Sequence, residues 1–220
     1  MAIKITSFTP EQGGDMSVVK DWFIENAANF FDEITEEEGV ISFKSGGRVV
    51  MTITKTVAAS SAIKIAFNCK TGLTVERTTG SAPTAGVQIK KLVATSKGIG
   101  IAVATSSTNN QSGECGAFVT KTNTGALGIV MYGVLQPGSV STQKQACIIS
   151  ENSAESDTLN LYTAKKAPLT VLCPLVCYGV EEYLPDCFFA PQSQYYTTEC
   201  RFTYNDESYF YSGRVALRDE

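Results

Sequence analysis

The sequence predicts a mainly β fold, a sandwich or partly open barrel, with one amphipathic helix near the N-terminus. After Gly39 the apolar residues change from a spacing of three or four positions to every second position. Turn residues then recur at intervals of roughly 8–12 residues, which is typical of sandwiches and barrels. In addition, 24 Thr and 19 Ser among 220 residues supply the neutral hydroxyls that suit exposed strand faces.

The helix is predicted over residues 17–34, where apolar residues recur at helical spacing and include the only Trp. Asp15 or Ser17 can cap its start, and Gly39 can close it. Glu36–Glu38 would then form a solvated last turn or, alternatively, face basic groups on a partner. We expect four aromatic side chains to form one buried surface, against the β-domain or against a neighbouring subunit: Trp22, Phe23, Phe30 and Phe31.

Strands are predicted where apolar and polar residues alternate between turn residues. Each of three hairpins has a glycine in its turn, and two further strands are indicated by apolar runs. The hairpins join 40–43 to 48–54, 63–69 to 73–75 and 117–120 to 126–132, and the further strands are 87–90 and 98–104.

Four regions follow from these elements. Residues 1–39 form an N-terminal part, in which an extended arm over Met1–Gly14 precedes the helix. Residues 40–135 form a β-rich core, and residues 136–158 have a mixed, linker-like composition with one apolar stretch, Ala146–Ile149. Residues 159–220 form a C-terminal β-rich portion that we expect to pack with the core as one unit.

The chain contains no histidine, which excludes Ser-His-Asp and Cys-His catalysis, HExxH zinc hydrolysis and His-ligated metal sites. Gly98-Ile-Gly100 begins like a dinucleotide-binding loop, but Val103 stands at the third glycine position. Paired carboxylates remain formally open for hydrolysis, yet the acids cluster in surface-like places such as Glu36–Glu38, Glu181-Glu182 and Asp206-Glu207. We therefore expect no enzyme activity, no cofactor and no small-molecule ligand.

The charge pattern disfavours nucleic acid as a partner. The net charge is −4, and no cluster of Lys or Arg exceeds two adjacent residues, whereas phosphate binding needs a concentrated basic face. The N-terminus has no apolar signal region, and no run approaches the roughly 20 apolar residues of a membrane span. We expect synthesis in a cytoplasm and no membrane partner.

The seven cysteines are predicted to be free thiols without metal, because their number is odd and no secretion signal is present. Cys173 and Cys177 have the spacing of a zinc knuckle, which is the alternative interpretation. Their apolar surroundings, Leu169–Tyr178, favour a buried strand in which cysteine fills space.

The C-terminal segment 169–220 carries a family resemblance. It contains Cys-Pro-Leu-Val-Cys177, then Tyr183-Leu-Pro-Asp-Cys-Phe-Phe-Ala-Pro-Gln192, then a terminal run from Cys200 to Asp219. This segment resembles the closing part of small structural proteins of tailed bacteriophages and prophages, although Asn205-Asp-Glu207 stands where a glycine turn is expected. The resemblance implies a virion protein made in the host cytoplasm, with copies of itself and other phage structural proteins as partners.

Three functions remain open at this point. The leading one is a non-enzymatic structural component of a phage particle, on the head surface or in the tail and baseplate, acting through self-assembly and protein–protein contacts. The second is a carbohydrate- or receptor-binding β-module that uses the C-terminal aromatics, among them Phe188-Phe189, Tyr195-Tyr196 and Tyr209–Tyr211. The third is a hydrolase with a carboxylate pair.

Overall fold

The structure is a computed structural model that describes residues 3–57, 63–78, 87–105, 115–136, 145–156, 159–160, 175–189, 200–204, 206–212 and 215–219. It is mainly β, as the sequence predicts, with two short helices near the N-terminus: α1 (Pro10–Gly14) and α2 (Met16–Asn26).

Twelve strands form one antiparallel sheet. They are β1 (Lys4–Ser7), β2 (Glu33–Glu37), β3 (Val40–Ser45), β4 (Arg48–Val57), β5 (Ile63–Cys69), β6 (Thr74–Thr78), β7 (Val87–Ala94), β8 (Gly98–Thr105), β9 (Cys115–Lys121), β10 (Leu127–Gln136), β11 (Gln145–Ser150) and β12 (Leu159–Asn160). The main path runs β1-β7-β8-β9-β10-β6-β5-β4-β3-β2, and β11 and β12 extend from β10. The predicted hairpins β3–β4, β5–β6 and β9–β10 are confirmed.

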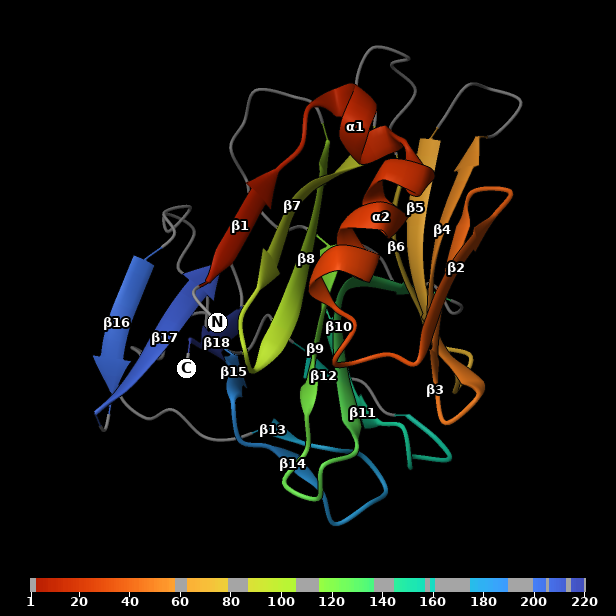
Figure 1. Cartoon of the computed structure of the whole chain (residues 1–220). Coiled ribbons are helices and arrows are strands. Elements are labelled where there is room, and N and C mark those ends of the chain that lie inside the picture. Colours follow the sequence, from red (N-terminus) through yellow and green to blue (C-terminus); the bar gives the residue numbers. More distant parts are fainter. Residues whose placement is uncertain are drawn as a thin grey trace.

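The sheet bends over on itself so that its two arms face each other across one apolar core (Figure 1). Strand β10 takes part in both arms, because its first part pairs with β9 and its last three residues pair with β6. Gly133 lies at this change, with φ +146°, and a Cβ there would lie 2.6 Å from a Val75 methyl group. Glycine is therefore the residue that allows β10 to pass from one arm to the other.

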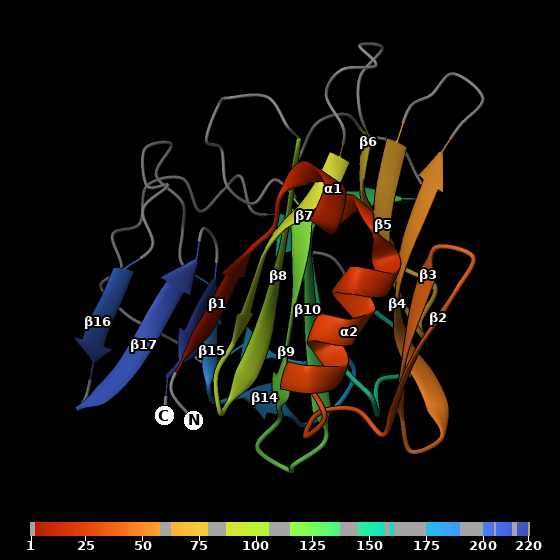
Figure 2. The ribbon, with the colours of Figure 1, turned by 45° about the horizontal axis from the view of Figure 1, so that its top comes forward.

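The sheet does not close into a barrel, and helix α2 lies across the opening between its end strands β1 and β2 (Figure 2). On one side the Trp22 indole N–H donates to Thr6 Oγ1 of β1 at 2.8 Å. On the other, the Ser17 hydroxyl donates to a Glu36 carboxylate oxygen of β2 at 3.2 Å. The helix thus covers core residues that an open sheet would leave exposed to water.

The predicted helix over 17–34 is wrong in its second half. Asp15 caps the start, as expected, by accepting from the Ser17 N–H at 2.9 Å. The helix ends at Asn26, whose side chain donates to the Trp22 carbonyl at 2.7 Å. Ile34 instead lies in β2, because the chain from Glu33 onward gains cross-strand pairing with β3.

Glu36–Glu38 and Gly39 therefore have a different role from the one expected. Glu37 pairs with Val40, so Glu38 and Gly39 are the two central residues of the β2–β3 turn. Both have positive φ, 49° and 80°, as in the type I′ turns that join right-twisted strands. Gly39 closes a hairpin rather than a helix, and the three acids lie in β2 and its turn rather than at the end of a helix.

Two other segments are more ordered than the sequence suggests. The N-terminal part is not a free extended arm, because Lys4–Ser7 pairs with Lys91–Ala94 of β7. Helix α1 then follows β1 along the chain. The apolar stretch in the linker-like region 136–158 is strand β11, which pairs with β10. The boundary placed between residues 39 and 40 falls inside the β2–β3 turn.

The C-terminal portion forms two small antiparallel sheets. They comprise β13 (Leu175–Val176) with β14 (Tyr183–Leu184), and the order β15-β18-β17-β16, with β15 (Cys187–Phe189), β16 (Cys200–Tyr204), β17 (Glu207–Ser212) and β18 (Val215–Arg218). A second apolar core joins them to the outer face of β9 and β10, where Leu184, Cys187 and Leu217 pack with Phe118 and Tyr132.

Candidate functional site

The four aromatic residues singled out in the sequence lie in the main core of a single chain. Trp22, Phe23, Phe30 and Phe31 are at most 6% exposed. Phe23 packs edge-on against Phe43 of β3, with ring centroids 4.9 Å apart, and Phe31 lies 4.8 Å from the same ring. Contacts within the chain account for their burial, so these four residues do not form an exposed interface.

In the three C-terminal aromatic clusters predicted to bind sugar, the side chains that the structure describes are also buried. Phe188 and Tyr209 are each 5% exposed and pack edge-on with centroids 5.1 Å apart. Tyr195 and Tyr196 lie outside the described residues, as does Cys173. Phe188 and Tyr209 therefore do not present ring faces to a sugar.

Exposed apolar side chains gather instead on the β13–β14 hairpin. Val176 is 69% exposed, and Tyr178 and Tyr183 are each 42% exposed. Val176 is the cross-strand partner of Tyr183, so both side chains project from the same face of the hairpin. Cys177 between them is buried, so the buried strand predicted over Leu169–Tyr178 is wrong at Val176 and Tyr178. We call Val176, Tyr178 and Tyr183 the hairpin platform.

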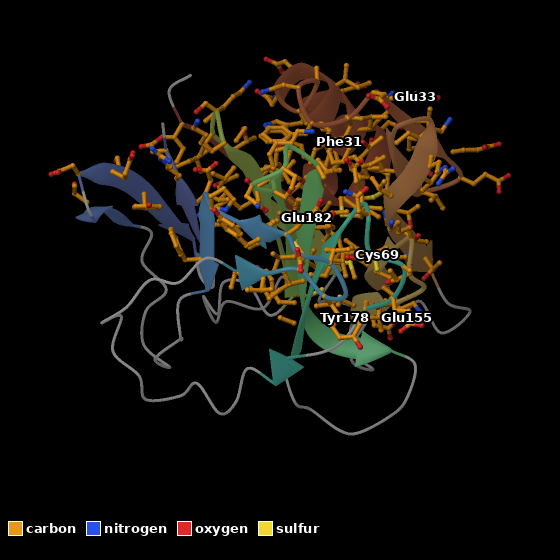
Figure 3. All side chains as sticks on the ribbon, turned by 90° about the horizontal axis from the view of Figure 1, so that it is seen from below. Phe31, Glu33, Cys69, Glu155, Tyr178 and Glu182 are labelled. Carbon is orange, nitrogen blue, oxygen red and sulfur yellow. The ribbon has the colours of Figure 1, made fainter. Side chains whose placement is uncertain are left out.

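Beneath the platform, the carboxylate of Glu182 holds three loops together. Its Oε1 accepts from the Thr124 hydroxyl at 2.7 Å and from the Asn152 amide at 2.8 Å. Thr124 belongs to the β9–β10 turn and Asn152 to the turn after β11. Figure 3, which views the molecule from the hairpin's end, places Glu182 among these elements and Tyr178 nearer the outside.

Backbone hydrogen bonds fix the hairpin on both sides. Tyr183 exchanges two bonds of 2.9 Å with Asn123, one through each residue's backbone N–H. The Tyr178 N–H donates to the Ile148 carbonyl at 3.2 Å, and the Ser153 hydroxyl donates to the Tyr178 carbonyl at 2.9 Å. The platform residues are thus mounted on a backbone that is already ordered.

The electrostatics of Glu182 agree with this structural role. Burial raises the pKa of its carboxyl, but the Ser150, Thr124 and Asn152 side chains and the positive charge of Lys70 together lower the pKa below its ordinary value. Among the described residues, Glu182 Oε2 is buried and has no hydrogen-bond partner. The neighbouring Cys177 thiol has its pKa raised to about 12 by burial and by the charge of Glu182. Glu182 is therefore a carboxylate, and Cys177 a neutral thiol, at neutral pH.

The exposed side chains of this site can make apolar and hydrogen-bonding contacts. Two tyrosine rings and a valine offer flat apolar area with hydroxyl groups at its edge, and exposed Asn123 and Asn152 lie beside them. The described acidic triplet Glu36–Glu38 and the pairs Glu181-Glu182 and Asp206-Glu207 form no common cluster, since they lie at three different turns, β2–β3, β13–β14 and β16–β17. Among the described residues, no group of three or more Cys, Asp and Glu is arranged to hold a metal ion.

Sequence reasoning missed the hairpin platform. Its signal is Tyr178-Gly-Val-Glu-Glu-Tyr183, in which Gly179 at φ 73° allows the turn between two exposed tyrosines. In the described part of the chain, no helix is long and apolar enough to cross a membrane. Comparison with known proteins gives no match to any family model, curated protein or solved structure.

Proposed function

We propose that the protein is a non-enzymatic structural component of a bacteriophage particle, which acts through contacts with copies of itself and with other particle proteins. The observation that carries the proposal is the hairpin platform: exposed apolar side chains on a hairpin that hydrogen bonds hold in place. Exposed apolar area that is grouped on one rigid element is typical of protein interaction sites.

The phage setting is supported by the resemblance of residues 169–220, because the platform lies inside that segment. Leu175–Cys177 and Tyr183 belong to the two motifs that carry the resemblance. The segment that resembles phage structural proteins is therefore also the part of the described chain with grouped exposed aromatics.

Physical reasons favour binding through this hairpin over binding through other exposed residues of the chain. Burial of apolar area contributes about 25 cal/mol per Å², and tyrosine is enriched in the centres of interfaces. A hairpin that is already ordered loses little conformational entropy when it docks, so more of that gain remains as affinity. By comparison, Val57 is 65% exposed, but its strand β4 is rich in Thr and has no exposed aromatic residue.

A carbohydrate- or receptor-binding module is the second candidate. Tyr178 and Tyr183 lie next to exposed Asn123 and Asn152, and an aromatic face with amide groups beside it suits a sugar ring. This version of the candidate uses the hairpin tyrosines, since Phe188 and Tyr209 are buried.

The test compares two valines of similar exposure. Light scattering at micromolar concentration is measured for the full chain, alone and with candidate head and tail proteins, and for Val176→Asp and Val57→Asp. We expect wild-type and Val57→Asp protein to associate and Val176→Asp to lose at least tenfold in affinity. A monomeric wild-type protein that ignores every particle protein would overturn the proposal. Glycan binding by that monomer, lost in Tyr183→Ser, would establish the second candidate.

A further inference from the structure

Two buried cysteines from distant parts of the chain meet where the two arms of the sheet come together. Cys69 ends β5 in one arm, and Cys147 lies in β11, paired with Met131 of β10 in the other. Both belong to the main core. Along β11 the side chains alternate, so that Cys147 and Ile149 face the main core while Ala146 and Ile148 face the second core.

The two thiols are hydrogen-bonded to each other. This bond from Cys147 is the largest influence on Cys69, and it lowers the pKa of Cys69 to about 6 against the opposing effect of burial. The Thr71 side chain and the backbone N–H groups of Thr71 and Leu73 add to the lowering. The Cys69 sulfur lies 2.9 Å from Thr71 Oγ1. The Cys147 thiol and the backbone N–H groups of Thr71 and Leu73 are thus the donors that stabilise a Cys69 thiolate.

Separate contacts hold the two segments together beyond the thiols. The Thr71 hydroxyl donates to Ser156 Oγ at 2.8 Å, and the Lys70 ammonium donates to the Glu151 carbonyl. Ser45 Oγ donates to a Glu151 carboxylate oxygen at 2.6 Å. The turn after Cys69 and the loop that follows the strand of Cys147 are therefore held together.

We propose that Cys69 and Cys147 form an oxidisable pair that closes to an intramolecular disulfide when the protein meets a hydroperoxide. The Cys69 thiolate attacks one peroxide oxygen, the O–O bond breaks, and Cys69 becomes a sulfenic acid with release of hydroxide. The Cys147 sulfur then attacks the Cys69 sulfur, the S–O bond breaks, and oxygen leaves as water with the thiol proton. The two sulfurs lose two electrons in all, and these reduce one peroxide to the level of water.

The burial of the pair favours a small oxidant. Cys69 is 6% exposed and Cys147 is fully buried, so hydrogen peroxide reaches Cys69 more readily than a bulky disulfide does. Cys147 lies within reach as the resolving thiol, which limits further oxidation of Cys69. The inference does not depend on the proposed function.

The test is mass spectrometry of the full chain. Reduced protein is treated with hydrogen peroxide, unfolded, alkylated and digested with trypsin without reduction. We expect a linked pair of peptides, residues 65–70 with residues 145–165, and alkylation of two fewer of the seven cysteines. In Cys69→Ser and in Cys147→Ser this pair disappears. In Cys187→Ser, which removes another buried thiol whose pKa burial raises, the pair is retained.

The wild-type spectrum alone decides the outcome if either serine variant fails to fold. Recovery of both peptides unlinked after peroxide treatment would overturn the proposal, and so would a link from Cys69 to any other cysteine. A sulfinic acid on Cys69 with Cys147 still alkylated would overturn it too, because it shows that Cys147 does not resolve the sulfenic acid.

Discussion

Trp22 donates its indole N–H to the Thr6 hydroxyl at 2.8 Å, so the only tryptophan of the chain fastens helix α2 to the end strand β1. Lys4 and Glu25 make an ion pair of 2.9 Å beside it, but this pair is exposed and contributes little. The attachment of α2 to the sheet therefore depends on Trp22 and on the apolar side chains that the helix places in the core.

Replacing Phe23 by Ala should destabilise the protein by about 3–5 kcal/mol, because the ring is fully buried between Trp22 and Phe43 and leaves a cavity. Ile24→Ala is the matched control, since Ile24 is 50% exposed on the same helix and should change stability by less than about 0.5 kcal/mol. Urea unfolding followed by circular dichroism measures both. Equal midpoints for the two variants would contradict the packing of α2.

Gly116→Ala should destabilise the protein by about 1–3 kcal/mol, because the new methyl group would overlap the Ile101 carbonyl and the Tyr132 hydroxyl between adjacent strands. Gly14→Ala serves as the comparison, since its nearest neighbour would be Lys55 Nζ at 3.6 Å, an ordinary contact. Differential scanning calorimetry should show a lowered Tm for the first and almost none for the second. An unchanged Tm for Gly116→Ala would argue against the close approach of β8, β9 and β10.

Glu182→Gln should cost about 1–3 kcal/mol at pH 7, through loss of charge-assisted hydrogen bonds to Thr124 and Asn152. The folded pKa of Glu182 lies below its ordinary value of 4.5, so its contribution is present above about pH 4.5 and is lost as the pH falls. The difference between wild type and variant should therefore shrink on acidification. Glu181→Gln, at the exposed neighbour, should be neutral throughout, and a constant difference between pH 7 and pH 3 would refute the assignment.

Cys69 gives the stability a second dependence on pH, between about pH 6 and pH 9. Its folded pKa is about 6 and its ordinary value 9.0, so its contribution is complete above pH 9 and disappears as the pH falls through 6. Under reducing conditions, the Tm of wild type relative to Cys69→Ser should rise between pH 6 and 9. Cys177, whose pKa is raised to about 12, is present in both proteins, so its effect cancels from the difference. A flat difference would mean that Cys69 is not a thiolate.

The sequence predicts the parts of this fold that are specified locally. Hairpins such as β5–β6 need only alternation and a glycine turn, and both are visible in the chain. The end of α2 is not visible, because Phe30 and Phe31 continue the helical spacing although they pack from a turn and the segment after it. The sequence does not indicate strand β1 either, since Lys4–Ser7 has no strand pattern of its own and is identified by its pairing with β7.

The site was less predictable than the fold. Exposure of Val176 and Tyr178 follows from the pairing of β13 with β14, whereas the apolar composition of the segment favours burial. The sequence suggests that Glu182 is a surface acid, because its partners Thr124 and Asn152 are distant in sequence. The contact of Cys69 with Cys147 likewise depends on the bend of the sheet, which no local pattern records.

The order of strands has a consequence for the growing polypeptide on the ribosome. Strands β2 to β6 are neighbours in sequence and in space, so this meander has all its internal pairing available once residue 78 has emerged. The free side of β6 is covered only when residues 134–136 of β10 arrive. Until then, a nascent chain presents an unpaired strand, and β6 is where two unfinished copies would join.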